Sequence, residues 1–266
     1  MGGTPKLCPY FKRRRFMLYH GDCLEILPLI PAESIDMVFA DPPYGLSNNG
    51  MTCRSGKMVS VNKGAWDRKI GGPDEQLQFH LSWINACKRV LKPNGTIWIS
   101  GTFHSIYATG YALQVAGFHI LNDIVWFKPN GAPNLGRRTF THSHETLLWA
   151  KKAPKAKHWF DYDFTVHGQW PKDILKTPNR QMRSVWGIPT TGPSEKLSGR
   201  HPTQKPLSLL SRIILATTKV GDTILDPFSG SSTTGLVATA ERRSFIGIEK
   251  SKKYLNLSIR RFQAIT

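Results

Sequence analysis

Residues 223–240 read Thr-Ile-Leu-Asp-Pro-Phe-Ser-Gly-Ser-Ser-Thr-Thr-Gly-Leu-Val-Ala-Thr-Ala, and this stretch decides the fold. Thr223–Asp226 predicts a short strand that Pro227 ends, and residues 233–240 predict a helix. The small residues between them allow the backbone to approach a ligand closely. A strand, such a turn and a helix in succession are typical of an α/β protein that binds a ligand at the carboxyl edge of its sheet.

Strands and helices alternate along the rest of the chain, which predicts a mostly parallel sheet with helices on both faces. The expected strands are 16–20, 34–40, 96–100, 118–127, 145–150, 223–226 and 245–249. The expected helices are 23–30, 76–91, 104–116, 206–218, 233–240 and 252–262. Residues 45–72 predict a long loop, and residues 151–200 predict a loop-rich insertion.

An acidic residue follows the turn of small residues at a spacing in the sequence that is typical of ribose binding. Glu249 ends the next expected strand, 249 − 226 = 23 residues after Asp226. An acid near that spacing commonly accepts hydrogen bonds from ribose hydroxyls. The pattern favours a nucleoside-type cofactor, although a strand-to-helix turn without a ligand is the plain alternative.

A second motif, Asp41-Pro42-Pro43-Tyr44, also stands at the carboxyl end of an expected strand. Such a group suits methyl transfer to an exocyclic amine, whose lone pair is delocalised into an aromatic ring. A carboxylate and a backbone carbonyl in the stiff Pro-Pro turn can accept the two N–H hydrogens and localise that lone pair, and Tyr44 offers a ring for stacking. Catalysis would then rest on positioning and electrostatics. A purely structural Asp-Pro-Pro loop is the alternative.

The composition points to a polyanionic partner. Lys and Arg number 36 against 18 Asp and Glu, which gives a net charge of +18, with 40% hydrophobic and 11% aromatic residues. This apolar content excludes a disordered basic tail. The charge is +5 over residues 1–20, −1 over 21–127, +10 over 128–212 and +4 over 213–266. A strongly cationic globular protein most often meets nucleic acid, with an anionic membrane as the second possibility.

Several classes of protein are not indicated by the sequence. No apolar run approaches the roughly 18–20 residues of a membrane span, and the basic stretch 1–15 lacks the apolar region of a signal peptide. Four cysteines without CxxC spacing predict neither a zinc site nor a disulfide framework. We therefore expect no metal, no membrane contact and a reducing cytosol.

The two motifs together resemble the S-adenosylmethionine-dependent amino-methyltransferases of DNA. Further blocks agree with this family over nearly all of residues 16–262: His20–Leu24, Arg89–Gly95, Asn122–Trp126, His201–Pro206 and Phe245–Glu249. The catalytic motif precedes the cofactor motif, which is the order of the β group. The resemblance implies a Rossmann-like sheet of seven strands, one antiparallel, in circularly permuted order, with strand 16–20 supplying the position that would otherwise follow Phe245–Glu249.

The resemblance also implies residue roles. Asp41 and the Pro42 carbonyl would hold the target amine, with Pro43 stiffening the turn and Tyr44 stacking on the base. The predicted cofactor residues are Asp22 near the adenine, Asp41, Thr203 and Lys205 near the carboxylate, Asp226, Phe228 with the turn Ser229, Gly230 and Ser231, and Glu249 at the ribose. The family often has glycine where this chain has Ser232, which puts the turn geometry there in question.

The target base and the target site follow from finer comparisons. Asp at the first motif position favours adenine N6 over cytosine N4, and a cytosine-C5 enzyme would need a cysteine nucleophile, usually after proline, which is absent. The target atom lies inside the duplex, so the base must be flipped out. The residues 46–67 resemble the DpnA-type second methylases of DpnII-like systems, which modify GATC, while residues 126–149 equally resemble GANTC-methylating cell-cycle and HinfI-type enzymes.

The basic segment between the two motifs is expected to recognise the DNA sequence. Arg side chains hydrogen-bond to guanine and Gln side chains to adenine in the major groove. The predicted DNA-contacting residues are Lys63, Arg137, Arg138, His142, Arg180, Gln181 and Arg183. For most of them a plain phosphate contact is an equal alternative.

The predicted organisation is a basic arm at 1–15 followed by one methyltransferase domain at 16–266. That domain divides into a catalytic half at 16–127, a target-recognition segment at 128–200 and a cofactor-binding half at 201–266. The expected partners are DNA and, in function rather than in complex, a restriction endonuclease, unless the enzyme acts alone as an orphan methylase. Of the two candidate sites, GATC is favoured over GANTC. The chain would be a monomer or a homodimer in a bacterial or archaeal cytosol. The alternatives are an N4-cytosine or RNA amino-methyltransferase, and a catalytically silent nucleic-acid-binding subunit.

Overall fold

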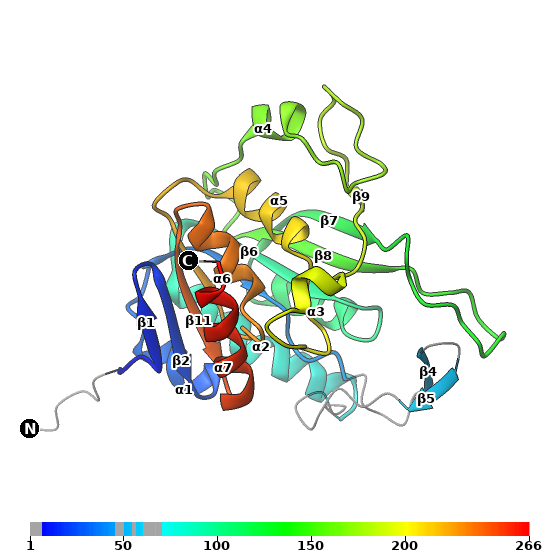
Figure 1. Cartoon of the computed structure of the whole chain (residues 1–266). Helices are drawn as coiled ribbons and strands as arrows, with labels where there is room; N and C mark the ends of the chain where they lie inside the picture. Colours follow the sequence, from blue (N-terminus) through cyan, green and yellow to red (C-terminus); the bar gives the residue numbers. More distant parts are fainter. Residues whose placement is uncertain (1–6, 46–50, 55–56, 61–66, 68–70, 266) are drawn as a thin grey trace, which may run out of the picture.

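One mixed sheet forms the centre of the molecule, and helices cover both of its faces (Figure 1). The computed structural model describes residues 7–45, 51–54, 57–60, 67 and 71–265. The strand order in this sheet is β1-β2-β11-β10-β3-β6-β8-β7-β9. Its strands are β1 (Phe11–Arg13), β2 (Phe16–His20), β3 (Ile35–Ala40), β6 (Leu91–Gly101), β7 (His119–Phe127), β8 (His144–Lys151), β9 (Val185–Gly187), β10 (Thr223–Asp226) and β11 (Ser244–Glu249).

The helices follow the strands in the alternation that the sequence predicts. They are α1 (Cys23–Ile26), α2 (Pro73–Val90), α3 (Ile106–Val115), α4 (Tyr162–His167), α5 (Leu207–Thr217), α6 (Thr233–Ala240) and α7 (Lys252–Gln263), with 3₁₀ turns at Leu27–Leu29 and Pro193–Lys196. No helix among the described residues is long and apolar enough to cross a membrane.

Two apolar clusters form the core, one on each face of the sheet. In β3 the side chains of Met37 and Phe39 belong to one cluster, and those of Val38 and Ala40 belong to the other. Successive residues of a strand point to opposite faces, so a strand buried on both faces must be apolar throughout. The first cluster includes residues of α5, α6 and α7, and the second includes residues of α1, α2 and α3.

The permuted strand order is confirmed. β2 pairs in parallel with β11, in the register Phe245 to Phe16 through Glu249 to His20. The Phe16 ring stacks on Phe262 of α7 at 4.3 Å between centroids and lies 5.2 Å from the Phe245 ring. The start and the end of the chain thus share one aromatic cluster.

The sheet has nine strands rather than the seven expected, and the two extra ones lie at its edges. β1 pairs antiparallel with β2, and Phe11 packs edge-on against Phe16 and Phe262. The predicted arm at 1–15 is therefore too long, because residues 11–13 belong to the sheet. At the other edge β9 pairs in parallel with β7. As expected from the resemblance, β8 is antiparallel to both of its neighbours.

Short elements also interrupt the segments predicted to be loops. A two-stranded sheet of β4 (Met51–Arg54) and β5 (Lys57–Ser60) lies within 45–72, and α2 begins at Pro73 rather than at residue 76. The 151–200 insertion contains α4 and β9. Elements of three to six residues carry too little periodicity to be distinguished from turns.

Gly235 provides a test of the packing between α6 and the sheet. A Cβ atom at this position would lie 2.4 Å from the Phe245 ring and 2.6 Å from the Phe16 ring. We expect Gly235→Ala to lower the free energy of unfolding by about 1–3 kcal/mol, because overpacking outweighs the better helix propensity of alanine.

The matched control is Gly110→Ala in α3, where the added Cβ atom would meet only Leu148 Cδ1 at 3.5 Å. This variant should gain roughly 0.5–1 kcal/mol. Urea unfolding of both variants measures the difference, and equal effects of the two substitutions would contradict the packing described.

Candidate active site

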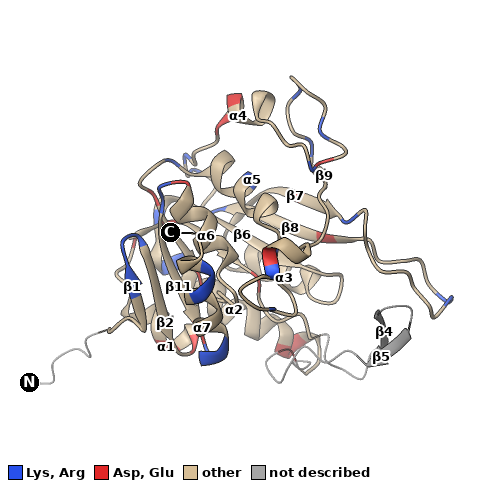
Figure 2. Ribbon diagram, in the orientation of Figure 1, with Lys and Arg blue, Asp and Glu red and all other residues tan. Residues whose placement is uncertain are grey.

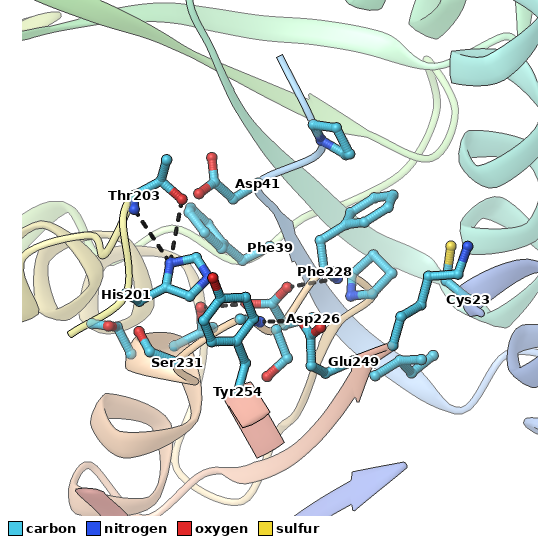
Figure 3. A pocket seen from close by; sticks show the side chains of 18 of the residues that line it. Cys23, Phe39, Asp41, His201, Thr203, Asp226, Phe228, Ser231, Glu249 and Tyr254 are labelled. Carbon is cyan, nitrogen blue, oxygen red and sulfur yellow. Dashed lines mark hydrogen bonds between the residues drawn. The ribbon is translucent and has the colours of Figure 1, made fainter. Parts of the chain in front are cut away.

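Three acidic residues end neighbouring parallel strands at one edge of the sheet (Figure 3). Asp226 ends β10 and Glu249 ends β11, while Asp41 directly follows β3. β10 pairs in parallel with both β3 and β11, so the three carboxyl ends coincide. The two motifs therefore meet at one site, as the sequence predicts.

A cavity of about 470 Å³ lies along this edge. Its volume is in the range of small-molecule and cofactor sites. All of the residues that the sequence assigns to a cofactor line it: Asp22, Asp41, Thr203, Lys205, Asp226, Phe228, Ser229, Gly230, Ser231 and Glu249. Pro43 of the catalytic motif also lines the cavity. Sequence reasoning did not single out Trp83, His201, Lys250 or Tyr254, which complete the wall.

The turn of small residues has the close backbone approach that it was expected to provide. Gly230 has a φ of +51°, and a Cβ atom there would lie 3.2 Å from His201 Nε2. Its N–H donates to Glu249 Oε2 at 2.9 Å. Ser232, where the family often has glycine, keeps the left-handed conformation, with a φ of +54°, and its hydroxyl lies 2.6 Å from Ser229 Oγ. A serine thus holds a backbone conformation that favours glycine.

A buried arginine supports this turn from α7. Arg261 Nη1 donates to Ser231 O at 2.6 Å, to Ser231 Oγ at 3.0 Å and to Thr233 Oγ1 at 2.9 Å. Burial lowers the pKa of Arg261 to about 10. Nothing in the sequence marked this residue, because an arginine near the end of an amphipathic helix predicts a solvated side chain.

The carboxylates in the cavity differ in environment. Asp226 accepts hydrogen bonds from Thr234 Oγ1 at 2.7 Å and from Phe228 N at 3.1 Å, and burial raises its pKa to about 7. Burial also raises the pKa of Glu249, whose other oxygen accepts from Ser251 N at 2.7 Å. These acids can accept hydrogen bonds from ligand hydroxyls and offset a positive charge.

Asp22 has a structural role in addition to lining the cavity. Its side chain caps α1 by accepting from Leu24 N at 2.8 Å, and it pairs with Lys250 Nζ at 2.6 Å. Among the described residues, no group of three or more His, Cys, Asp or Glu side chains could hold a metal ion.

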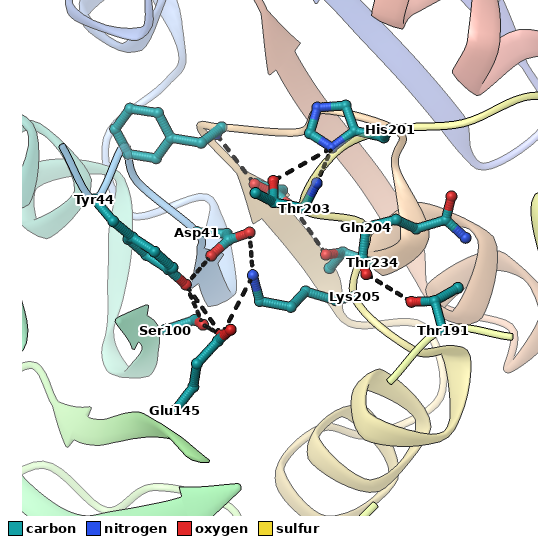
Figure 4. A network of polar contacts seen from close by, with 12 residues as sticks. Asp41, Tyr44, Ser100, Glu145, Thr191, His201, Thr203, Gln204, Lys205 and Thr234 are labelled. Atoms are coloured by element: carbon teal, nitrogen blue, oxygen red, sulfur yellow. Dashed lines mark hydrogen bonds and ion pairs between the residues drawn. The ribbon is translucent and has the colours of Figure 1, made fainter. Parts of the chain in front are cut away.

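Asp41 is the centre of a buried polar network (Figure 4). Its Oδ2 pairs with Lys205 Nζ at 2.5 Å, and its Oδ1 accepts from the Tyr44 hydroxyl. Lys205 was expected near the carboxylate of a cofactor, but here its ammonium contacts Asp41. Burial raises the pKa of Asp41, while Asp41 and Glu145 outweigh the effect of burial on Lys205 and raise the pKa of that ammonium.

Glu145 on β8 is a second carboxylate of this network, and sequence reasoning missed it. Its Oε2 lies 3.6 Å from Lys205 Nζ and accepts from Ser100 Oγ at 3.3 Å, and its Oε1 pairs with Lys128 Nζ at 2.5 Å. Burial opposes its ionisation, but Lys205 and Lys128 lower its pKa below the usual range. Two lysines thus balance the two acids, Asp41 and Glu145. An acid at the start of a strand carries no sequence signal of its own.

Tyr44 is oriented differently from the expectation of an open stacking ring. Its side chain is only 7% exposed, and its hydroxyl turns inward to Asp41, with Ser100 Oγ at 2.6 Å. Its backbone N–H donates to Asp67 Oδ1 at 2.9 Å. The Lys205 ammonium lies 5.3 Å from the centre of the ring. Stacking on a base remains a prediction.

The predicted DNA-contacting residues fall on two projections from the body, visible in Figure 2 as basic loops. Arg137, Arg138 and His142 lie on the connection between β7 and β8. Arg180, Gln181 and Arg183 line a second cavity of about 310 Å³ beside Asp173 and Arg212. Lys63 lies outside the described residues. None of the other six lines the first cavity.

Comparisons with known proteins agree with this geometry. Residues 35–260 match the model of the N6/N4 methyltransferase family, described as DNA methylase. The chain is 50% identical to the Type II methyltransferase M2.DpnII of Streptococcus pneumoniae, over 99% of this chain and 95% of that protein. It is 49% identical to M2.LlaDCHI of Lactococcus lactis subsp. cremoris, over 98% and 94% of the two chains.

Solved structures share the architecture. The crystal structure of an M1.HpyAVI–SAM complex has a TM-score of 0.65 and 28% identity, covering 92% of this chain and 98% of that one. The cytosine-N4-specific PvuII DNA methyltransferase has a TM-score of 0.74 over 96% and 88% of the two chains, but at 22% identity it shows the fold alone.

The buried network gives a prediction about stability. Glu145→Gln leaves the Lys128 ammonium without its anion and removes one of the two carboxylates beside Lys205, and removing one partner of a buried pair typically costs about 3–5 kcal/mol. Glu33→Gln is the matched control, because Glu33 pairs with Lys152 at 3.2 Å with 56% of its side chain exposed, and it should cost less than about 1 kcal/mol. Urea unfolding at neutral pH compares them, and similar losses in the two variants would refute the coupling assigned to Glu145.

The raised pKa of Asp226 predicts a pH dependence. The native carboxyl keeps its proton up to about pH 7, whereas in the unfolded chain it releases the proton near pH 4. Between these values unfolding releases a proton, so this group's contribution to stability falls as the pH rises and is lost above pH 7. Asp226→Asn removes this dependence.

We therefore expect the stability of Asp226→Asn, relative to the unsubstituted protein, to be greater at pH 8 than at pH 5 by about 2 kcal/mol. Chemical unfolding of the ligand-free proteins at both pH values measures this difference. The substitution removes the hydrogen bond from Thr234 at both pH values, so the loss of that bond cancels in the comparison. A difference that does not change with pH would show that Asp226 ionises normally.

Proposed function

The chain belongs to the N6/N4 family of DNA methylases, and from its site we propose that it transfers a methyl group from S-adenosylmethionine to N6 of adenine in GATC sites of duplex DNA. The observation that carries the proposal is the position of Asp41. Its carboxylate lies at the edge of the cavity lined by the cofactor residues and at the centre of the network formed by Tyr44, Lys205 and Glu145. One acceptor therefore faces both the methyl donor and the incoming base.

The cavity suits the proposed cofactor in charge and size. Acidic side chains of Asp22, Asp41, Asp226 and Glu249 line it, and its volume is about 470 Å³. Acids that accept from hydroxyls fit a ribose, and an excess of acids fits a cation. When bound, S-adenosylmethionine supplies a methyl group on a positively charged sulfur.

Asp41 activates the amine by orienting it. The Asp41 carboxylate and the Pro42 carbonyl accept the two N–H hydrogens of the adenine N6 group, so that its lone pair points along the direction of attack. Burial raises the pKa of Asp41, and Lys205 opposes this shift because its ammonium stabilises the ionised carboxylate. The chain thereby lowers the barrier by positioning and preorganised charge, without a covalent intermediate.

The reaction also leaves one proton to be removed. N6 gains a methyl group and must lose one hydrogen as a proton. Burial has already raised the pKa of Asp41, so its carboxylate is a better acceptor than an exposed aspartate. Asp41 Oδ2 takes the proton and passes it to water, and Glu145 keeps the charge on Lys205 balanced while Asp41 is neutral.

The target base reaches this site only outside the helix. The exocyclic amine of a paired adenine lies within the base stack, so the base must rotate out of the duplex. The two basic projections extend outward from the body (Figure 2). Their Arg and Lys side chains would bind phosphates and fix the duplex, so affinity should fall steeply with salt.

GATC is proposed because residues 46–67 resemble the DpnA-type enzymes and because the chain is similar to M2.DpnII over almost its full length. We further propose that the enzyme protects DNA against a restriction endonuclease of the same specificity in a bacterial cytosol. The methyltransferase and the endonuclease would act on the same DNA site without forming a stable complex with each other.

The base is tested by nucleoside analysis. Purified protein is incubated with S-adenosylmethionine and a duplex that holds a single GATC site, and the DNA is digested and examined by mass spectrometry. N6-methyldeoxyadenosine is expected from the duplex that holds GATC, and none is expected from a duplex without this site. N4-methylcytosine would make the enzyme a cytosine methylase, and transfer to structured RNA instead would overturn DNA as the substrate.

The role of Asp41 is tested by Asp41→Asn, which keeps the size of the side chain but removes its charge. We expect methyl transfer to fall by about 100-fold to 1,000-fold, the loss typical of one preorganised electrostatic contact. DNA affinity in a mobility-shift assay should change less than about threefold.

Asp123→Asn, on the exposed part of β7, is the charge-matched control and should retain normal transfer. Turnover by Asp41→Asn at the rate of this control would rule out the mechanism.

A further inference from the structure

The connection between β7 and β8 projects from the edge of the sheet that carries Asp41 (Figure 1). β3 is parallel to β6, and β8 is antiparallel to both β6 and β7, so β7 runs in the same direction as β3. The connection at 128–143 therefore leaves the sheet at the carboxyl edge, beside the active site. We call this segment the hairpin.

The root of the hairpin is joined to the catalytic network. Lys128, its first residue, donates to Glu145 Oε1, and Glu145 Oε2 lies near Lys205, the partner of Asp41. The backbone N–H of Lys128 also donates to Ser143 O at 2.7 Å. A contact made by the hairpin is thus mechanically connected to the residue that holds the amine.

The tip of the hairpin has a defined conformation. The Asn134 amide donates to Thr139 O at 2.8 Å and to Thr139 Oγ1 at 2.7 Å, and its oxygen accepts from Gly136 N at 2.9 Å. Arg137 has a left-handed φ of +53°, which a non-glycine residue adopts only where its surroundings support it. These contacts hold the tip in a turn that presents residues 137–140 outward.

The tip combines an aromatic ring with positive charge. Phe140 is 96% exposed, the largest exposed fraction among the large hydrophobic side chains that the structure describes. Arg137 and Arg138 are exposed next to it. Leaving a phenylalanine in water forgoes about 1.5–3 kcal/mol of burial energy, and the ordered turn gives the ring no protein surface to cover. The charge beside it favours a polyanion as the occupant.

We propose that Phe140 inserts into the base stack of the duplex beside the position that the target adenine leaves, with Arg137 and Arg138 on the adjacent phosphates. Apolar side chains flanked by basic residues act as such wedges, and the ring replaces part of the stacking lost when the base flips. Phe140 is thus a specificity-determining contact that stabilises the flipped state, and it touches neither the cofactor nor the amine. The inference rests on the proposed function.

Phe140 lies close to the root of the hairpin. It stands three residues before Ser143, whose carbonyl oxygen accepts from Lys128 N at 2.7 Å, so an extended chain places it at most about 10 Å beyond the root. The link through Lys128 and Glu145 then couples insertion at the tip to the position of Asp41.

The test compares Phe140→Ala, Phe140→Trp and a control, Tyr107→Ala, which removes a 76% exposed aromatic ring from α3. The first measurement is kcat/KM on a duplex with one GATC site. The second is made on the same duplex with an abasic site opposite the target adenine, where the pairing that opposes flipping is absent. The third is the fluorescence of 2-aminopurine at the target position, which rises when that base unstacks.

We expect Phe140→Ala to lower kcat/KM on the paired duplex about 10-fold, in the range of one lost stacking contact, with less than a twofold loss on the abasic duplex. The rise in 2-aminopurine fluorescence should be lost in Phe140→Ala and retained in Phe140→Trp and Tyr107→Ala. Equal losses on both duplexes, with normal fluorescence, would make Phe140 a simple surface contact and overturn the proposal, as would normal kcat/KM in Phe140→Ala. If the unsubstituted protein methylates neither duplex, the proposed function itself fails.

Discussion

The ion pair between Lys205 and Asp41 is the interaction on which the site depends. It joins residues 164 positions apart, and both side chains are almost entirely removed from water. A buried carboxylate at the end of β3 would otherwise take up a proton and lose its value as an acceptor for an amine. Lys205 opposes this uptake, although burial still raises the pKa of Asp41, and Glu145 and Lys128 complete a balanced group of two acids and two cations. The catalytic motif thus becomes effective only when the segment that follows the 151–200 insertion folds against it.

The parallel order of β3, β10 and β11 makes that meeting possible. It brings three acids from distant parts of the sequence to one edge, between the turn that cradles the cofactor and the hairpin that we infer to enter the duplex. The aromatic cluster of Phe11, Phe16 and Phe262 ties the two ends of the chain together beneath this edge. The permuted order therefore changes the connectivity of the sheet while the geometry of its carboxyl edge is preserved.

Sequence reasoning succeeded where a residue's position follows from its own strand. Asp41, Asp226 and Glu249 were placed correctly because a residue at the end of a parallel strand must lie at the carboxyl edge. It failed where a contact depends on the packing of distant elements. Glu145 and Arg261 act through partners far away in sequence, and Tyr44 turns inward because its hydroxyl donates to Asp41 and forms a hydrogen bond with Ser100. The edge strands β1 and β9 have three residues each, too few for a periodic pattern.

The uneven distribution of charge along the chain corresponds to the arrangement of the structure. The excess of basic residues at 128–212 is carried largely by the projections around a neutral catalytic core, which suits a phosphate backbone outside and a cationic cofactor inside. The central claim is that this site methylates adenine N6 in GATC. Long-read sequencing of DNA from a host that lacks its own adenine methylase and expresses this chain maps modified bases and their sites together. The account predicts N6-methyladenine at GATC and at no other sequence; methylated cytosine, or methylated adenine outside GATC, would contradict it.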